Sequence, residues 1–323
     1  MGLAIYISTE ERLECDMEYD EHQGILIEEA IQAMVYDTSG NYVDMTFGRG
    51  GHAQRMLHSL DDSARLLVLD RDPEAIQVAK ELAEKDDRVT WAHERFGNLG
   101  ELVIESESLH GVLFDLGVSS PQLDDPRRGF SFLRDGPLDM RMDSSRGFSA
   151  AEWISSASEE EISDVIYRYG EERHSRRMAK RVVEARRLKP ISTTLELAEL
   201  FKAAHPSWQR DRHPATKAFQ AIRIHVNNEL DELSQGLDIA LDRLCVGGRI
   251  VVISFHSLED RIVKRFMSRH TRGDDFPRGL PITESELRPR LKLIGKPRRV
   301  SSLELADNVR SRSAIMRVAQ KIK

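Results

Sequence analysis

Short apolar runs alternate with amphipathic stretches over the first third of the chain. Residues 41–70, NYVDMTFGRGGHAQRMLHSLDDSARLLVLD, give an apolar run, a glycine-rich turn, an amphipathic stretch and a second apolar run that closes on an acid. A helical stretch at 73–84, the run RVTWAH and a fourth apolar run, GVLFDLGVSS, continue this alternation. Four strands that alternate with helices predict a parallel, doubly wound α/β sheet, with ligands at the carboxyl ends of the strands.

The alternation stops at residues 119–149, where Ser, Pro, Gly and Asp are frequent and no period is sustained. Arginines and phenylalanines interleave there, which suits contact with phosphates and unpaired bases; a flexible linker is the alternative. The next residues, up to 205, read as helices only. We therefore expect an acidic, poorly ordered leader at 1–21, an inserted helical domain at 141–205, and a sheet domain formed by 22–140 and 206–323.

Apolar positions spaced three or four apart from Ala215 to Leu244 predict one long helix where the sheet domain resumes. The run GGRIVVISFHS supplies a fifth strand, and Ser257 with Asp260 resembles a capping box at the start of the next helix. Near the C-terminus, LKLIGKPRRV and SRSAIMRVAQKI both alternate. These two segments could pair as an antiparallel hairpin at the edge of the sheet.

Gly48, Gly50 and Gly51 follow the first strand, where a backbone without Cβ atoms can turn sharply and approach a ligand. The helix after them points free N–H groups at that ligand. Asp70, at the end of the second strand, is placed to accept hydrogen bonds from ribose hydroxyls. This unit predicts a pocket for a nucleoside cofactor.

Two cofactors fit such a pocket. The loose pattern G-x-G-x-x-A at 48–53 is compatible with NAD. Asp44 favours S-adenosylmethionine, because a carboxylate just before the glycines would repel a pyrophosphate and suits the cationic amino acid end of that cofactor. A reversed terminal strand is likewise expected of Rossmann-like methyltransferases. The alternative is that no ligand binds here. The glycine-rich turn would then only cap a helix, and Asp44 would form a salt bridge with Arg49 or Arg55.

The composition, with 40% hydrophobic and 31% charged residues, describes a soluble globular protein of 323 residues. No apolar run is long enough to span a bilayer, and Cys15 and Cys245 form no pair motif, so we expect a cytoplasmic location and no membrane partner. The net charge of −7 is uneven, because residues 286–323 hold eleven Lys or Arg against three acids, and 171–189 hold eight against three. These stretches are solvated faces or phosphate-binding patches.

Six separated strings occur in order: VDMTFGRGGH at 43–52, LDRDPEAI at 69–76, DLGVSSPQLDDPRRGFSFLRDGPLDMRMD at 115–143, HPATKAFQAIRIHVNNEL at 213–230, ISFHSLEDRIVK at 253–264 and RSRSAIMRV at 310–318. From about His22 onward they closely resemble the bacterial small-subunit ribosomal RNA cytosine-N4 methyltransferase family, the RsmH/MraW type. The resemblance implies a Rossmann-like S-adenosylmethionine-dependent methyltransferase sheet with an inserted all-helical substrate-recognition domain. It implies N4-methylation of a decoding-centre cytidine in an assembled small subunit. It also implies cofactor binding by Gly50, Gly51, His52, Asp70, Phe96, Asp115 and Gln122.

The chemistry needs an in-line approach of the N4 amine to the methyl sulfonium and an acceptor that orients its N–H bonds. Asp115, at the end of the fourth strand, is one candidate for this acceptor. If Asp115 binds the cofactor instead, a backbone carbonyl or the side chain of Ser119, Asn227 or His256 would orient the amine. Methylation at C5 would need a thiolate, and neither cysteine lies in a strand-end motif. No H-x-x-x-H or cysteine cluster accompanies His52 or His256, so we expect structural histidines and no metal.

Two other classes of protein remain as alternatives. A nicotinamide-dependent oxidoreductase accounts for the glycines and Asp70 but leaves Asp44 and the basic stretches unexplained. A non-catalytic ribosome-assembly factor would keep the fold without turning over the cofactor. The sequence does not define the oligomeric state.

Overall fold

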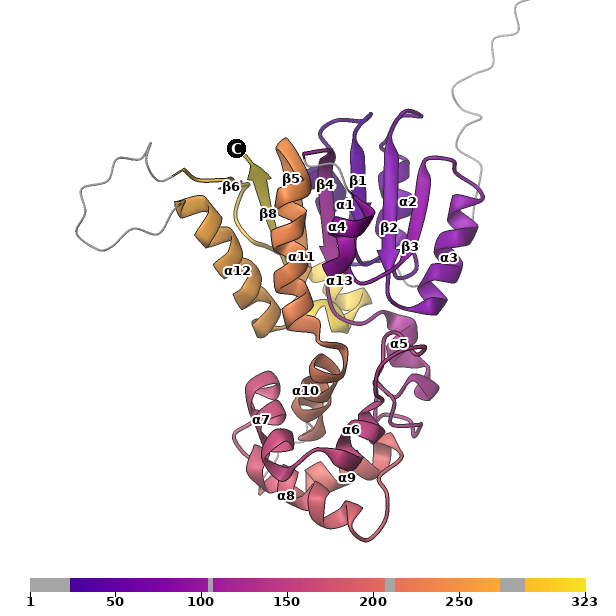
Figure 1. Cartoon of the computed structure of the whole chain (residues 1–323), viewed down its shortest axis with the longest axis vertical. Helices are drawn as coiled ribbons and strands as arrows, with labels where there is room; N and C mark the ends of the chain where they lie inside the picture. The colour runs from indigo at the N-terminus through magenta and orange to yellow at the C-terminus, as the bar shows by residue number, and fades with distance from the viewer. Residues whose placement is uncertain (1–23, 104–106, 207–212, 274–287) are drawn as a thin grey trace, which may run out of the picture.

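The computed structural model describes residues 24–103, 107–206, 213–273 and 288–323, so the predicted leader lies outside the described residues. Within them, eight strands form one sheet in the order β3-β2-β1-β4-β5-β8-β6, with β7 paired to β8. The sheet occupies the upper part of Figure 1, and a group of helices lies below its lower edge.

The centre of the sheet is parallel and consists of β1 (Asn41–Asp44), β2 (Arg65–Asp70), β3 (Val89–His93), β4 (Leu109–Asp115) and β5 (Leu244–Ser254). At its edge, β8 (Ile315–Lys321) runs antiparallel to β5 and also pairs with β6 (Leu291–Leu293) and β7 (Arg298–Arg299). The predicted parallel sheet, the C-terminal antiparallel pairing and the reversed terminal strand are confirmed.

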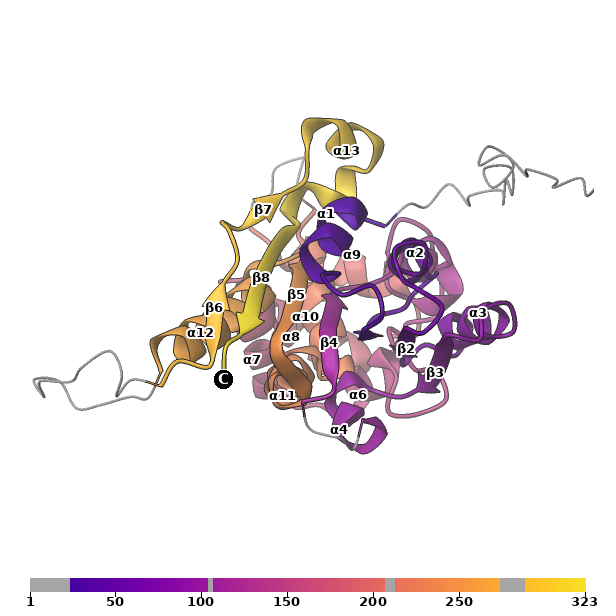
Figure 2. The same cartoon turned by 90° about the horizontal axis from the view of Figure 1, so that it is seen from above.

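Helices cover both faces of the sheet (Figure 2). One face carries α1 (Ile27–Met34), α2 (Gly51–Leu57) and α3 (Pro73–Ala83), whose apolar sides share one core with β1 and β2. The other carries α4 (Leu99–Leu102), α11 (Glu229–Arg243) and α12 (Ser257–Arg272), which pack on β4 and β5. A short segment, α13 (Ser302–Asp307), precedes β8. No helix in the described part of the chain is long and apolar enough to cross a membrane.

The lower part of the molecule is a helical unit formed by α6 (Ala150–Ser156), α7 (Glu159–Gly170), α8 (Ser175–Arg186) and α9 (Thr194–Ala204). Capping boxes begin three of these helices, at Ser149, Ser158 and Thr193. Their buried core extends beyond the predicted limits of 141–205. It also takes in Phe130, Leu138 and Met140 from the preceding loop, and Ala215, Ala218, Phe219 and Ile222 from the following helix.

The prediction of one long helix from Ala215 to Leu244 is wrong. The chain forms α10 (Ala215–Asn227) and then α11, because Asn228 adopts a left-handed conformation with φ of 51° between them. Asparagine tolerates this region better than most residues. α10 packs with the helical unit and α11 with the sheet, while Leu244 begins β5.

The loop at 119–149 is more ordered locally than its composition indicates. It contains α5 (Ser120–Asp124) and a single 3₁₀ turn, Pro126–Arg128. Nη1 of Arg128 donates to Oδ2 of Asp72 at 2.8 Å, and the Phe132 ring packs on Phe219 with centroids 4.8 Å apart. Part of the Arg and Phe pattern that suggested RNA contact is therefore used inside the protein.

Candidate cofactor and substrate pocket

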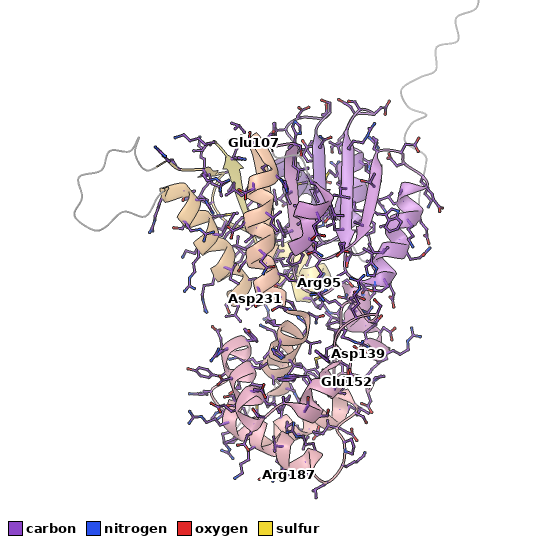
Figure 3. The ribbon with its side chains drawn as sticks, in the orientation of Figure 1. Arg95, Glu107, Asp139, Glu152, Arg187 and Asp231 are labelled. Atoms are coloured by element: carbon purple, nitrogen blue, oxygen red, sulfur yellow. The ribbon has the colours of Figure 1, made fainter. Side chains whose placement is uncertain are left out.

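A cavity of about 330 Å³ lies at the carboxyl ends of β1, β2 and β4. This volume is in the range of small-molecule sites. Figure 3 places one lining residue, Arg95, at the lower edge of the sheet, where it faces the helical unit. The cavity wall includes eight of the residues predicted from the sequence, which are Gly48, Gly51, His52, Asp70, Phe96, Asp115, Ser119 and Gln122.

The glycine turn between β1 and α2 depends on positive φ angles, +57° at Gly48 and +82° at Gly50. A Cβ at Gly50 would lie 2.8 Å from the Phe47 ring, so only glycine fits there without movement. Gly50 does not itself line the cavity; it is the N-cap residue of α2, and the first two residues of that helix, Gly51 and His52, line the cavity. Its contribution is therefore the shape of the turn.

Asp70 is held rigidly at the end of β2. Its Oδ2 accepts the N–H of Gly48 at 2.8 Å, and its Oδ1 accepts the N–H of Asp72 at 2.8 Å. Burial raises the pKa of Asp70, although these two N–H groups oppose the shift. A carboxylate fixed in this way has lone pairs left for two adjacent hydroxyl groups, as a ribose would offer.

Asp115 ends β4 beside a histidine that does not neutralise it. Its Oδ2 lies 3.7 Å from Nδ1 of His52, and its buried Oδ1 has no hydrogen-bond partner among the described residues. Burial raises the pKa of Asp115 well above its usual value, and Asp44 and Glu259 add to the shift. Burial also lowers the pKa of His52 to about 4, so this ring is neutral near pH 7. The site thus suits a ligand that carries positive charge.

Asp44 was predicted to contact the cofactor directly. In the structure it lies beneath the cavity and does not line it. Its side chain is 1% exposed and Oδ1 accepts the N–H of Thr46 at 3.1 Å. Burial, helped by the nearby Asp70, raises its pKa to about 7, although Thr46 opposes this. Arg49 and Arg55 pair with glutamates and not with Asp44. Because Asp44 does not line the cavity, it acts on a ligand there only through the electric field of its carboxyl group.

Gln122 and Ser119 share the start of α5. The side-chain Oε1 of Gln122 accepts the N–H of Ser119 at 3.0 Å, and the Ser119 hydroxyl accepts the N–H of Gln122 at 3.4 Å. Nε2 of Gln122 donates to Asp72 at 2.7 Å, the same carboxylate that pairs with Arg128. These bonds fix the loop at 119–128 against the start of α3 and leave Ser119 on the cavity wall.

Phe96, for which the resemblance implies cofactor binding, lies between the cavity and the apolar core. Its ring lines the cavity and also packs edge-on against Phe114, with centroids 5.8 Å apart. Gly236 of α11 makes room for it, because a Cβ there would lie 2.9 Å from the ring. The ring is therefore a fixed apolar wall for the cavity.

Two predicted catalytic residues are not brought into the cavity wall. Asn227 is 1% exposed, and its amide donates to the carbonyl of Met140 at 2.7 Å and accepts the N–H of Met142 at 2.8 Å. His256 caps α12 in a capping box with Glu259, so the predicted cap at Ser257 is wrong by one residue. Both side chains make contacts within the protein, and the assignment of either residue to the target amine stays a prediction.

Glu259, Arg223 and Glu229 line the cavity although sequence reasoning did not select them. Arg223 donates to both carboxylate oxygens of Glu229, each at 2.8 Å. Burial acts to raise the pKa of Glu259, but His256, Arg223 and the N–H of Phe255 hold it below its usual value. A capping box that starts at His256 was the available signal for Glu259.

The parallel sheet with a reversed strand, the glycine turn after β1 and the acids that end β2 and β4 define a Rossmann-like protein of the methyltransferase type. The chain belongs to the MraW methylase family, whose model matches residues 19–322. This membership favours methyl transfer over the nicotinamide alternative.

A curated relative is similar over most of the chain. It is Ribosomal RNA small subunit methyltransferase H of Chromohalobacter salexigens, 54% identical over 305 residues, which cover 93% of this chain and 92% of that protein. Solved structures to which the chain is similar include a putative rRNA-methylase from Clostridium thermocellum, at 12% identity over 93% of this chain and 97% of that chain with a TM-score of 0.43. Another is a putative methyltransferase from Streptococcus mutans in complex with SAH, at 11% identity over 92% and 95% with a TM-score of 0.40.

Proposed function

We propose that this protein transfers the methyl group of S-adenosylmethionine to N4 of a cytidine in small-subunit ribosomal RNA. One observation carries the proposal: a chain that is 54% identical to a ribosomal RNA small subunit methyltransferase has, beside its glycine turn, a cavity walled by the uncompensated carboxyl of Asp115. The amine of a nucleobase and a sulfonium cofactor both suit such a group.

In this proposal, residues at the carboxyl ends of the strands would hold S-adenosylmethionine. Asp70 would accept hydrogen bonds from the ribose hydroxyls, Phe96 would pack against the adenine, and Asp115 would face the positively charged end. A pyrophosphate would find little free positive charge, because the arginines of the wall are paired with carboxylates. These are Arg49, Arg71, Arg95, Arg223 and Arg310.

The methyl transfer depends on the orientation of the two reactants more than on covalent catalysis by the protein. The N4 nitrogen attacks the methyl carbon in line with the C–S bond, the sulfur keeps the bonding electron pair, and N4 loses one proton. Asp115, on the cavity wall, can accept a hydrogen bond from the amine, orient that N–H bond and take the proton when its carboxyl group is ionised. Ser119, on the same wall, is the second candidate to orient the amine.

The position of Cys245 favours methylation at nitrogen over methylation at C5. It lies on β5, with Sγ 3.5 Å from the hydroxyl of Tyr36, and does not line the cavity. Cys15 lies outside the described residues. A C5 methyltransferase needs a cysteine thiolate beside the base, and no described residue supplies one at this cavity.

The helical unit offers a face for RNA. Arg173, Arg176, Arg177 and Lys180 are exposed on or just before α8, and in the described part of the chain none of them has an acidic partner. Figure 3 shows Arg187 at the far end of the same unit. Phosphate contacts from such a face would position the RNA without reading its sequence. We propose an assembled small subunit as the substrate, as the sequence resemblance implies, and a cytoplasmic site of action, as expected from the composition.

Transfer of a labelled methyl group to under-methylated small ribosomal subunits tests the function. We expect label in the RNA, little label in fully methylated subunits, and loss of transfer in Asp115→Asn. Binding of the cofactor without any transfer would contradict the proposal and favour a non-catalytic assembly factor. Absence of cofactor binding would contradict it as well.

A further inference from the structure

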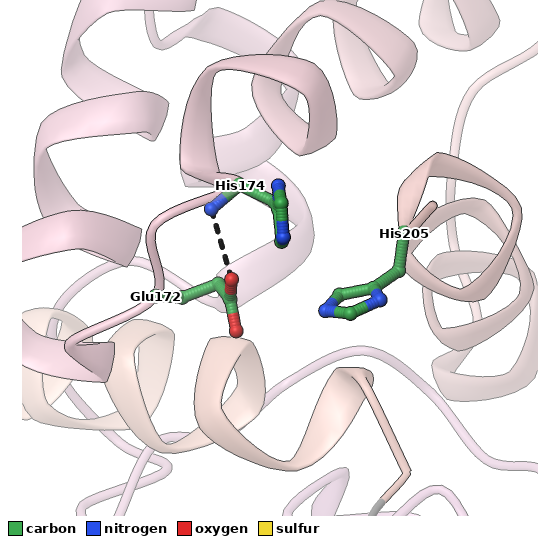
Figure 4. Close-up of side chains that lie close together, drawn as sticks. All are labelled: Glu172, His174 and His205. Carbon is green, nitrogen blue, oxygen red and sulfur yellow. Dashed lines mark hydrogen bonds between the residues drawn. The ribbon is translucent and has the colours of Figure 1, made fainter. Parts of the chain in front are cut away.

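A second cluster of ligand-type side chains lies in the helical unit, apart from the cavity. Glu172 and His174 come from the turn between α7 and α8, and His205 follows the end of α9. One ligand atom from each residue lies within 4.8 Å of the others. Figure 4 shows the three side chains directed toward a common space.

Glu172 is buried without an ordinary counter-charge. It is 7% exposed, and one carboxylate oxygen accepts the N–H of His174 at 2.9 Å. Among the described residues, no Lys or Arg lies within ion-pair distance of this carboxylate. Removing a carboxylate from water is costly unless a cation or several hydrogen bonds compensate. This side chain is therefore short of positive charge.

The two histidines supply nitrogen ligands around that carboxylate. Their rings meet edge to face, with centroids 4.7 Å apart and an angle of 78° between planes. Nδ1 of His205 is buried and has no hydrogen-bond partner among the described residues. Two imidazoles and one carboxylate form a donor set that zinc prefers, with a water as the fourth ligand.

A similar group near the cavity is compensated in another way. Glu229, His256 and Glu259 also lie within 4.8 Å of one another. There, Arg223 already binds both oxygens of Glu229, and the N–H groups of Phe255 and His256 donate to Glu259. That group therefore needs no metal to balance its charge.

We propose that Glu172, His174 and His205 bind a divalent transition metal ion, Zn²⁺ by the chemistry of the donors. Ligand atoms in a tetrahedral zinc site are roughly 3.3 Å apart, so small side-chain rotations must draw these three together. His174 directly precedes α8, and His205 caps the end of α9. The ion would join these two helix ends and hold the basic face of α8 in place. This site does not depend on the proposed methyl transfer.

Titration of chelator-treated, full-length protein with Zn²⁺ tests the site without an activity assay. We expect one tight equivalent, a higher melting temperature with zinc, and Co²⁺ absorption bands typical of tetrahedral nitrogen and oxygen coordination. His174→Ala and His205→Ala should each weaken zinc binding by more than about 100-fold, beyond what loss of an outer hydrogen-bond partner causes. His58→Ala, an exposed histidine at the end of α2, is the matched control and should bind zinc normally.

The melting temperature in excess chelator separates folding from metal binding. If His205→Ala melts near the wild-type temperature with chelator but no longer responds to zinc, the site is supported. His205→Gln, which keeps a polar side chain of similar length, serves if the alanine variant does not fold. Absence of a tight equivalent, or tight binding that persists in the double histidine variant, overturns the proposal.

Discussion

Nδ1 of His52 lies 3.7 Å from Oδ2 of Asp115, yet the two side chains do not form an effective ion pair. Burial lowers the pKa of His52 to about 4, so the imidazole carries no charge near pH 7. Burial also raises the pKa of Asp115 well above its usual value. The pocket therefore presents a carboxyl group that gains most from a positively charged ligand.

Replacement of Asp115 by asparagine keeps the size of the side chain and removes its negative charge. We expect the affinity for S-adenosylmethionine to fall by about tenfold or more, which is about 1.4 kcal/mol. The affinity for the product S-adenosylhomocysteine, which lacks the sulfonium charge, should fall less. Calorimetric titration of both ligands measures the difference. Asp164→Asn, on the exposed side of α7, is the control, and equal losses for the two ligands would argue against a role in charge recognition.

Asp44 makes the stability of the ligand-free protein depend on pH. Burial raises its pKa from 3.8 to about 7 in the folded state, so the folded protein holds more protons than the unfolded chain between these values. Its contribution to the free energy of unfolding is complete below about pH 4 and is lost as the pH rises through 7. Asp44→Asn removes this contribution.

His52 acts in the opposite direction over an overlapping range. Its pKa falls from 6.5 to about 4 on folding, so its contribution to stability grows as the pH rises between these values. The wild-type profile alone would mix the two effects. Denaturant titrations should therefore compare wild type with Asp44→Asn, and the difference in unfolding free energy should decline from pH 4 to pH 7. A constant difference would rule out the buried, protonated Asp44.

Gly50 and Gly147 separate the effect of backbone strain from that of steric overlap. Both have positive φ, +82° and +77°, but a Cβ at Gly147 meets nothing within 4 Å, whereas one at Gly50 would lie 2.8 Å from Phe47. Gly147→Ala should cost about 1 kcal/mol of unfolding free energy, from strain alone. Gly50→Ala should cost at least about 2 kcal/mol and also weaken cofactor binding, because the turn must move. Equal costs would show that the turn is not tightly packed.

The exposed basic face of α8 predicts salt-dependent binding of RNA. Arg177→Ala with Lys180→Ala should weaken RNA binding and reduce the slope of log affinity against log salt by about 1 for each charge removed. The affinity for S-adenosylmethionine should not change, since neither residue lines the cavity. Lys85→Ala, after the end of α3, is the control variant. An unchanged salt slope in the double variant would place the RNA elsewhere.

The strand ends could be predicted because their signal is local. Asp44, Asp70 and Asp115 each close an apolar run, and a parallel sheet brings the carboxyl ends of its strands to one edge. The glycine turn was visible for the same reason, because glycines at 48, 50 and 51 stand directly between a strand and a helix. Local sequence patterns therefore predicted the acids at the strand ends and the glycine turn beside the pocket.

The contacts that join distant segments could not be predicted in this way. Asn227 was named as a candidate to orient the target amine, but its hydrogen-bond partners Met140 and Met142 lie 87 and 85 residues earlier in the chain. Arg128 suggested a phosphate contact, whereas its partner Asp72 lies 56 residues away. No pattern within a helix reveals such partners. The helix break at Asn228 was hidden for another reason, because the apolar spacing continues across it.

Nucleoside analysis of the RNA after methyl transfer is the most direct measurement of the proposed reaction. Under-methylated small subunits are incubated with labelled S-adenosylmethionine, and the RNA is digested and separated. The pocket predicts label in N4-methylcytidine with wild-type protein and none with Asp115→Asn that has been shown to fold. Label in 5-methylcytidine or in a ribose-methylated nucleoside would contradict N4 as the acceptor.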